Sequence, residues 1–249
     1  MKKYLVMVLA VLFLVSTPIG AQDQTVQAAD QASQLFVAQV AGDVTVIHQG
    51  ASHPANPPEP LLKDDRVVTG DDGKAYLEFQ NGGTVQVGPD SDMAVQRLET
   101  TGPDFKARFL LAWGSFKAKV KKLTTPNSAF EVQAGGVVAG VRGTVFGVDY
   151  DKTSQQVSAQ TYEGSIFTRS GGKENVLDKG YSAVVQKTGL SIRSPLTGRQ
   201  ANSFKDFVDV SGAIEQKKQE MLQQMHQKIM DKIPVPDSLK NTLGQHLPF

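Results

Sequence analysis

Hydrophobic and polar positions alternate in short runs between Leu35 and Val185, and glycine or aspartate interrupts these runs. The clearest run is Ser115 to Val120, where apolar residues alternate with Lys117 and Lys119. A period of two with one apolar and one polar side predicts a half-buried strand. Many short strands with no helix-length crossover between them predict an all-β domain over residues 35–190, built as a solenoid-like stack or a sandwich.

Glycine-containing turns separate the expected strands. Asn81-Gly82 lies between the alternating runs Lys74 to Gln80 and Thr84 to Val87, and Asn-Gly is the strongest short-range indication of a hairpin. We expect another turn at Trp113-Gly114, with one strand on each side of it. The strands on either side of that turn would then be neighbours.

The period changes after a linker that we expect at residues 191–203. Apolar residues recur at helical spacing from Phe204 onward, and no proline follows in this stretch until Pro234. This pattern predicts an amphipathic helix over residues 204–233, with Ser211-Gly212 as a point where it could break, and then an irregular Pro-containing tail over residues 234–249.

The predicted helix carries an apolar stripe near its end, formed by Met221, Leu222, Met225 and Ile229. A lone helix of this kind is marginal in water, so the stripe must be buried against another surface. Two surfaces fit equally well: the β-domain of the same chain, or a second copy that would make the protein a homo-oligomer.

The N-terminus has the order of a secretory signal peptide. Lys2 and Lys3 precede an apolar run from Tyr4 to Val15, and small residues follow up to Ala21. The apolar run is shorter than the roughly 20 residues that a membrane-spanning helix needs. We therefore expect a signal peptide at residues 1–21 that is cleaved near Ala21, a flexible leader over residues 22–34, no transmembrane segment in the mature chain, and a periplasmic or secreted protein.

Composition narrows the class of protein further. The chain of 249 residues has no cysteine, so it has no disulfides and its stability must come from packing. Without Lys2 and Lys3, 24 basic side chains face 25 acidic ones. This balance argues against a dedicated nucleic-acid binder.

No combination of residue types points to catalysis. The four histidines, at positions 48, 53, 226 and 246, are not spaced as metal ligands. Gly140 to Gly143 lacks the Lys-Ser/Thr ending and the following helix of a phosphate-binding loop. Acid pairs such as Asp71-Asp72 lie beside glycine, where aspartates stabilise turns. We therefore predict a protein that is not an enzyme, with no catalytic residues, no cofactor and no metal site.

One dense basic cluster is the candidate binding face. On neighbouring strands its members would share one face, which could bind an anionic envelope polymer or a lipid head group. The simpler interpretation is that these lysines protect an edge strand from unwanted pairing. The cluster consists of Lys106, Arg108, Lys117, Lys119, Lys121 and Lys122.

Two further residues have open roles. Trp113 is flanked by Phe109 and Phe116, which favours a lid on the core over a platform that stacks against a sugar. Arg142 lies among valines, where its charge is costly unless it is paired or exposed. We favour an internal, structural role for Arg142 over contact with an anionic partner.

Six motifs in order resemble the FecR-like extracytoplasmic domain family over about Val37 to Val185. The most recognisable is AGVRGTVFGV at Ala139 to Val148, which contains Gly140, Arg142 and Gly143. The others are QVAGDVTV at 39–46, the run at 61–95 with its Asn-Gly hairpin and Gly-Pro, WGSFKAKV and TPNSAFEV at 113–120 and 125–132, and YEGSIFT at 162–168.

The resemblance implies a binding and signalling module without catalytic residues. Full-length regulators of this family also have a cytoplasmic segment that handles a sigma factor and a membrane helix, and this chain has a signal peptide in their place. We therefore expect a stand-alone exported module of the bacterial cell envelope that contacts another envelope protein or an anionic envelope polymer. The alternative is a structural envelope protein that forms homo-oligomers through its C-terminal helix.

Overall fold

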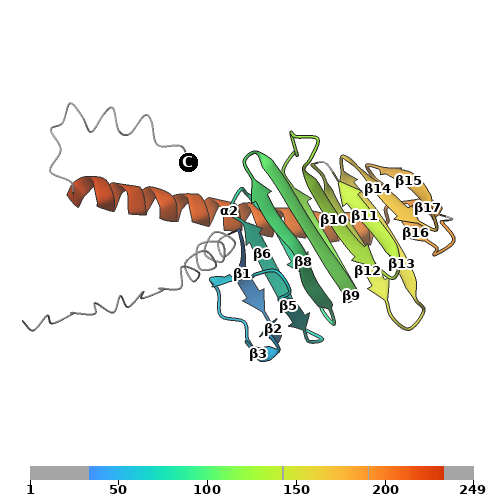
Figure 1. Ribbon diagram of the computed structural model, residues 1–249, viewed down its shortest axis with the longest axis horizontal. Coiled ribbons are helices and arrows are strands. Elements are labelled where there is room, and N and C mark those ends of the chain that lie inside the picture. The colour runs from blue at the N-terminus through green and yellow to red at the C-terminus, as the bar shows by residue number, and fades with distance from the viewer. Residues whose placement is uncertain (1–33, 142, 190, 233–249) are drawn as a thin grey trace, which may run out of the picture.

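The protein folds as a β-sandwich with one long helix across one face, as the computed structural model shows (Figure 1). The structure describes residues 34–141, 143–189 and 191–232. Within these residues, 17 strands form two open sheets that pack face to face. The prediction of an all-β domain followed by a helix is confirmed. The expected signal peptide and Pro-containing tail lie outside the described residues, as does the leader except for Gln34.

Sheet A lies beneath the helix. Its strand order is β4-β1-β6-β7-β9-β12-β13-β16-β17, and all its pairings are antiparallel. The strands are β1 (Leu35–Ala41), β4 (Glu59–Pro60), β6 (Lys74–Phe79), β7 (Gly83–Val87), β12 (Val145–Asp151), β13 (Gln156–Glu163), β16 (Tyr181–Val185), β17 (Ser191–Pro195) and the second half of β9 (Asp104–Val120).

Sheet B forms the opposite face. Its strand order is β3-β2-β5-β8-β9-β10-β11-β14-β15, and β10 runs parallel to β9. The strands are β2 (Val44–His48), β3 (Ala51–Pro54), β5 (Arg66–Thr69), β8 (Asp92–Thr101), β10 (Ala129–Ala134), β11 (Val137–Val141), β14 (Ser165–Ser170), β15 (Lys173–Asp178) and the first half of β9.

Strand β9 joins the two sheets. It pairs with β8 and β10 in sheet B up to Trp113, and with β7 and β12 in sheet A from Gly114 onward. Gly114 has φ = 102°, and a Cβ there would lie 2.5 Å from the Cα of Ser91. Only glycine fits such a bend. The expected turn at Trp113-Gly114 is therefore wrong: the glycine bends one continuous strand instead of closing a hairpin.

The core between the sheets consists of inward-facing residues from both layers. Its centre is a group of phenylalanine rings whose centroids lie 5.3–6.5 Å apart, formed by Phe79, Phe105, Phe109, Phe116, Phe130 and Phe146. Fully burying one such ring contributes roughly 1.5–3 kcal/mol to folding. This packing supplies the stability that a chain without cysteine cannot obtain from disulfides.

The helix α2 (Gly198–Lys232) begins earlier than predicted. Thr197 and Gln200 form a capping box, in which the backbone N of Gln200 donates to Thr197 Oγ1 (3.3 Å) and the backbone N of Thr197 donates to Gln200 Oε1 (2.9 Å). Residues 191–195 form strand β17 against β16, where we expected a linker. The helix also continues without a break through Ser211-Gly212.

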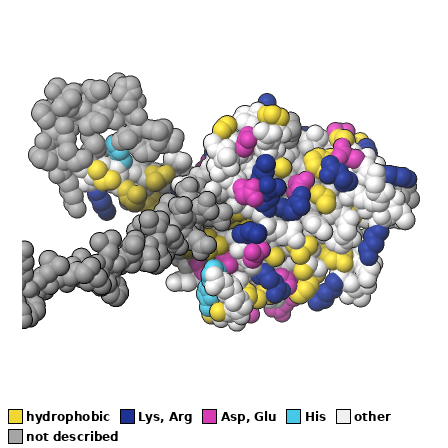
Figure 2. All heavy atoms as spheres, in the orientation of Figure 1, with side chains coloured by type: hydrophobic (Ala, Val, Ile, Leu, Met, Phe, Trp, Pro, Cys, Tyr) yellow, Lys and Arg dark blue, Asp and Glu magenta, His cyan; other side chains and the backbone are white. Residues whose placement is uncertain are grey.

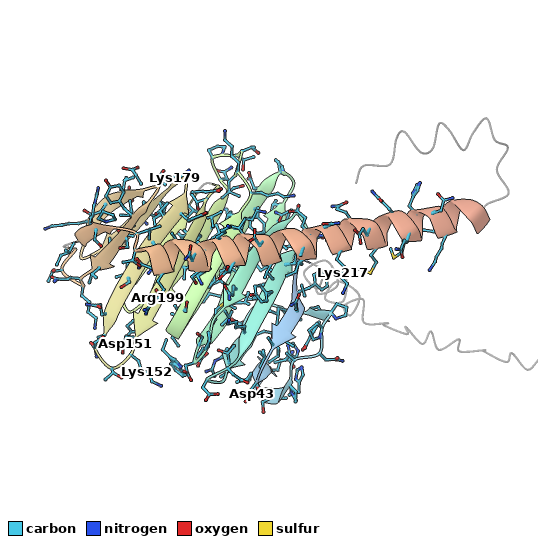
Figure 3. All side chains as sticks on the ribbon, turned by 180° about the vertical axis from the view of Figure 1, so that it is seen from behind. Asp43, Asp151, Lys152, Lys179, Arg199 and Lys217 are labelled. Carbon is cyan, nitrogen blue, oxygen red and sulfur yellow. The ribbon has the colours of Figure 1, made fainter. Side chains whose placement is uncertain are left out.

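The first half of α2 packs on the outer face of sheet A (Figure 3). Phe204, Phe207 and Ile214 form a second apolar cluster with Tyr76 and Val145. Phe204 also stacks on Tyr162, with ring centroids 5.5 Å apart and planes at 14°. Among the described residues, no helix is long and apolar enough to cross a membrane.

Candidate binding surfaces

The structure separates the six predicted basic residues. Phe105, Ala107 and Phe109 point into the core, so Lys106 and Arg108 lie on the outer face of sheet B. Lys117 and Lys119 lie on the outer face of sheet A, beneath α2. Lys121 and Lys122 follow the end of β9. The expectation that these residues share one face is wrong, because β9 passes from one sheet to the other between them.

Two of these residues also form ion pairs within the protein. Arg108 Nη2 lies 2.5 Å from Glu131 Oε2, and Lys121 Nζ lies 3.3 Å from Glu215 Oε1. Figure 2 shows the face opposite α2, where basic and acidic side chains are interspersed. The described surface therefore offers these residues no continuous basic patch.

Lys117 is held between sheet A and the start of α2. Its Nζ donates a hydrogen bond to Ser203 Oγ (2.8 Å) and lies 5.7 Å from the centroid of the Phe204 ring. Desolvation lowers the pKa of Lys117 below 10.5; Asp149 and Asp206 oppose this shift, and Lys74 reinforces it. Part of the predicted binding face is thus a helix–sheet contact.

The two glycines of the family motif have structural roles. The Phe167 ring lies over Gly140, and a Cβ there would be 2.0 Å from the ring. Gly143 has φ = 99°, and a Cβ there would be 2.6 Å from the Cα of Lys122. Arg142 lies outside the described residues, so its predicted internal role stays a prediction.

The predicted apolar stripe of α2 lies beyond the sandwich. Figures 1 and 3 show α2 leaving the sheets past Lys217, on the side of β1 and β6. Met221, Met225 and Ile229 are 56%, 51% and 56% exposed, and Leu222 is half-buried. We call residues 219–229 the overhang. Self-packing is therefore confirmed for the first half of α2 and not for the stripe.

Lys218 attaches α2 to the edge of the sandwich. Its Nζ lies 2.9 Å from Glu78 Oε1 and donates to the backbone oxygens of Phe79 and Gln80 (3.3 and 3.2 Å). These bonds hold the helix to the end of β6. They fix the direction in which the overhang projects.

A groove at one end of sheet A was not predicted from the sequence. Its wider part, about 530 Å³, lies between the bend of β9 and the β12–β13 hairpin. Trp113 lines it and belongs to neither apolar cluster, so the favoured role as a lid on the core is wrong. Lys152 Nζ lies 4.2 Å from the centroid of the Trp113 ring. Asp90 and Asp151 also line this part.

A narrower pocket of about 200 Å³ continues the groove toward α2. The two parts share Ser115 and Asp149. Asp149 Oδ2 accepts a hydrogen bond from Gln160 Nε2 (2.7 Å). Lys117 and Arg199 line the far end. Figure 3 shows Arg199 at the start of α2 and Asp151 and Lys152 near the end of β12, on the same face of the protein.

Sequence motifs could not reveal this groove, because segments far apart in the sequence build it, around Asp90, Trp113, Asp149 and Arg199. The capping box at Thr197 was the one available indication, since it places Arg199 in the first turn of α2. The strand bend at Gly114 and the pairing of β9 with β12 have no comparable local pattern.

Two histidines form polar contacts away from the groove. His48 Nδ1 lies 2.6 Å from the buried Asp65, and His53 Nε2 lies 2.5 Å from Glu59. In the described part of the chain, no three or more histidine and acidic side chains are grouped to hold a metal ion.

Comparison with known proteins identifies the central part of the chain. Two crystal structures, at 2.50 and 1.65 Å, of a candidate anti-sigma factor from Parabacteroides distasonis ATCC 8503 are similar to it, each with 13% identity and a TM-score of 0.46. Each match covers 56% of this chain and 63% of that one. No curated protein matches the chain. Residues 65–167 match the model of the family described as FecR protein, which is the family that the sequence motifs resemble.

Proposed function

We propose that this protein is a non-enzymatic regulatory module of the bacterial cell envelope, which acts by binding another envelope protein through the overhang of α2. The match to the FecR family supports a role in signalling or regulation. The sequence of residues 1–21 supports export, with cleavage near Ala21 and a periplasmic or secreted mature protein. The sandwich is then the folded body that presents the helix.

The observation that carries this proposal is the continuity of one helix stripe. The α2 residues that face sheet A recur every three or four residues along the chain, and the same spacing continues to Leu222, Met225 and Ile229. The apolar stripe therefore continues along the same side of the helix after the sheet beneath it has ended. Three exposed apolar side chains on one line are the pattern by which a helix enters an apolar groove of a partner.

A protein partner fits better than an anionic polymer. A polymer bound along the predicted basic cluster would need a continuous basic track, and β9 divides these basic residues between two faces of the sandwich. The polar residues of the overhang are mainly glutamines, at positions 219, 223, 224 and 227, and its charged ones are Glu220 and Lys228. A surface with so few charges permits close contact with a partner at a small cost in buried, unpaired charge.

Site-specific photocrosslinking in cells tests this proposal. A photoreactive amino acid in place of Met225 should crosslink to one protein, and the same residue in place of Gln223, on the opposite side of the helix, should not. Crosslinks from Met221 and Ile229 positions to the same protein would confirm the stripe as the contact surface. Absence of any crosslink, or equal crosslinks from both sides of the helix, would refute it.

A homo-oligomer is the second candidate function, and the spacing of the exposed residues favours it. In an antiparallel pair of overhangs centred on Met225, each Met221 would meet the Ile229 of the other copy. Such a two-fold contact is self-complementary, as dimer interfaces are. Analytical ultracentrifugation of the mature chain would show a dimer that Met225→Glu converts to a monomer, and crosslinks from Met225 would then join two copies of this chain.

A further inference from the structure

We infer that the groove between Trp113 and Arg199 binds a sugar chain that carries carboxylate groups. This inference goes beyond the proposed function, because the groove lies at the start of α2 and the overhang at its other end. The two surfaces can be tested separately.

The Trp113 end supplies a flat apolar surface beside hydrogen-bond acceptors. The wider part of the groove is open to solvent and combines this one indole ring with the carboxylates of Asp90, Asp149 and Asp151. An indole can stack against the apolar face of a sugar ring, and carboxylates accept hydrogen bonds from hydroxyl groups at its rim. Asp149 already accepts a hydrogen bond from Gln160, and Asp151 accepts two from the backbone N of Thr153 and Ser154, but a carboxylate has further acceptor sites for the hydroxyl groups of a ligand.

Lys152 covers the indole in the unbound protein. Its ammonium lies 4.2 Å from the ring centroid, which is a favourable cation–π position. The side chain belongs to the turn after β12 and is exposed, so it can move aside without disturbing the sheet. A sugar ring would take its place on the indole, and the two compete for the same surface.

The other end of the groove is suited to a negative group. Lys117 and Arg199 both line it, together with the hydroxyl-bearing Ser115 and Ser203 and the amide of Gln200. Hydrogen bonds from a lysine or arginine to a carboxylate are about twice as strong as those between neutral groups. Asp149 stands between the two ends and is already engaged by Gln160, which holds its carboxylate in place.

The arrangement therefore matches a short chain of sugars better than a single one. Stacking at Trp113 and the cationic pair at Lys117 and Arg199 lie in two adjoining pockets of about 530 and 200 Å³. A ligand that bridges them needs a ring at one end and an acid at the other. An oligosaccharide of uronic acids has both.

Trp113 is the single tryptophan of the chain, so its fluorescence reports directly on the groove. The experiment titrates the mature protein with the trimer of galacturonic acid and, as a matched ligand, with its methyl ester. We expect a saturable change of emission with the acid, and binding at least about tenfold weaker with the ester, the loss typical of one charge-assisted hydrogen bond.

Three variants assign the interaction to residues. Arg199→Gln and Lys117→Met should each weaken binding of the acid about tenfold and leave the ester unchanged. Lys152→Ala should tighten binding of the uncharged ester, because it removes the cation that competes for the indole ring. Lys217→Gln, on the exposed part of α2 near the sheet edge, is the control and should change neither.

Three results would overturn the inference. One is the absence of a saturable emission change up to millimolar trimer in the folded wild-type protein. Another is equal affinity for acid and ester. The third is unchanged acid binding by Arg199→Gln, a surface variant that should fold normally. Because the overhang is intact in all these proteins, each of these results leaves the proposed protein contact unaffected.

Discussion

Ser211 Oγ donates a hydrogen bond of 2.7 Å to Thr84 Oγ1, at the point where α2 crosses strand β7. Ser211 is 1% exposed, so the helix backbone comes close to the sheet there. A small residue at the crossing permits this approach, and the adjacent Gly212 takes no part in it, since a Cβ there would meet no atom within 4 Å. Ser211, one of the two residues where the helix could have broken, instead attaches it to the sandwich.

Enlarging Ser211 should therefore separate the helix from the sheet. We expect Ser211→Leu to lower the free energy of unfolding by about 1–3 kcal/mol, because the larger side chain has no space against β7. Ser211→Ala removes only the hydrogen bond and should cost about 1 kcal/mol. Urea denaturation of both variants checks this. A Leu variant as stable as the Ala variant would contradict the close crossing.

The two halves of the α2 stripe should differ in their effect on stability. Phe204 is fully buried on sheet A, so Phe204→Ala should cost about 3–5 kcal/mol. Met225 is exposed, and Met225→Ala should change the free energy of unfolding by less than about 0.5 kcal/mol. Thermal and urea unfolding of the purified monomer measure both. A large loss for Met225→Ala would show that the overhang is buried in the protein itself.

The alternating pattern was sufficient to predict strands but not the layer to which each belongs. Within Ser115 to Val120 the inward and outward positions are as expected, because burial of one face dictates a period of two. The assignment of Lys106 and Lys117 to one face was wrong, because the sequence does not indicate that β9 bends at Gly114 and enters the other sheet. That choice depends on a contact with Ser91, 23 residues earlier.

The helix shows a similar division between local and long-range information. Its existence and apolar stripe follow from a period near 3.6. Its start at Gly198 is also encoded locally, in Thr197 and Gln200, and lies before the start at Phe204 that the apolar spacing predicts. The point where the sheet ends beneath it depends on the width of the sandwich, and no helix pattern carries that information. The groove, which needs Trp113, Asp149 and Arg199 together, was unpredictable for the same reason.

The glycines provide a matched pair of stability tests. Gly140→Ala should lower the free energy of unfolding by about 1–3 kcal/mol, because its Cβ would overlap the Phe167 ring, against which Arg169 also lies. Gly212→Ala meets no atom within 4 Å in a helix and should raise stability by roughly 0.5–1 kcal/mol. Differential scanning calorimetry compares them. Equal shifts in Tm would show that the Phe167 ring does not constrain position 140.

The half-buried Lys117 should make stability depend on alkaline pH. Desolvation lowers its folded-state pKa below the unfolded value of 10.5, while Asp149 and Asp206 oppose the shift and Lys74 reinforces it. Between the lowered pKa and 10.5 the unfolded chain binds more protons at this residue than the folded protein does. Its contribution to the free energy of unfolding must therefore rise with pH through this window.

Comparison with Lys117→Met isolates that contribution. At a pH below the lowered pKa, Lys117 is charged in both the folded and the unfolded wild-type protein. The folded wild type then bears the full desolvation cost of this charge beneath α2. The Lys117→Met variant has no charge at this position and avoids the cost. The stability difference between variant and wild type should therefore be most favourable to the variant near neutral pH and should shrink as the pH approaches 10.5. Urea titrations at several pH values measure the difference directly, and other titrating groups cancel in it. A difference that is constant with pH would show that Lys117 has the same pKa in the folded protein and the unfolded chain. A difference that grows in the variant's favour as the pH rises would show that Asp149 and Asp206 outweigh desolvation and raise the folded-state pKa. Either result would contradict the prediction.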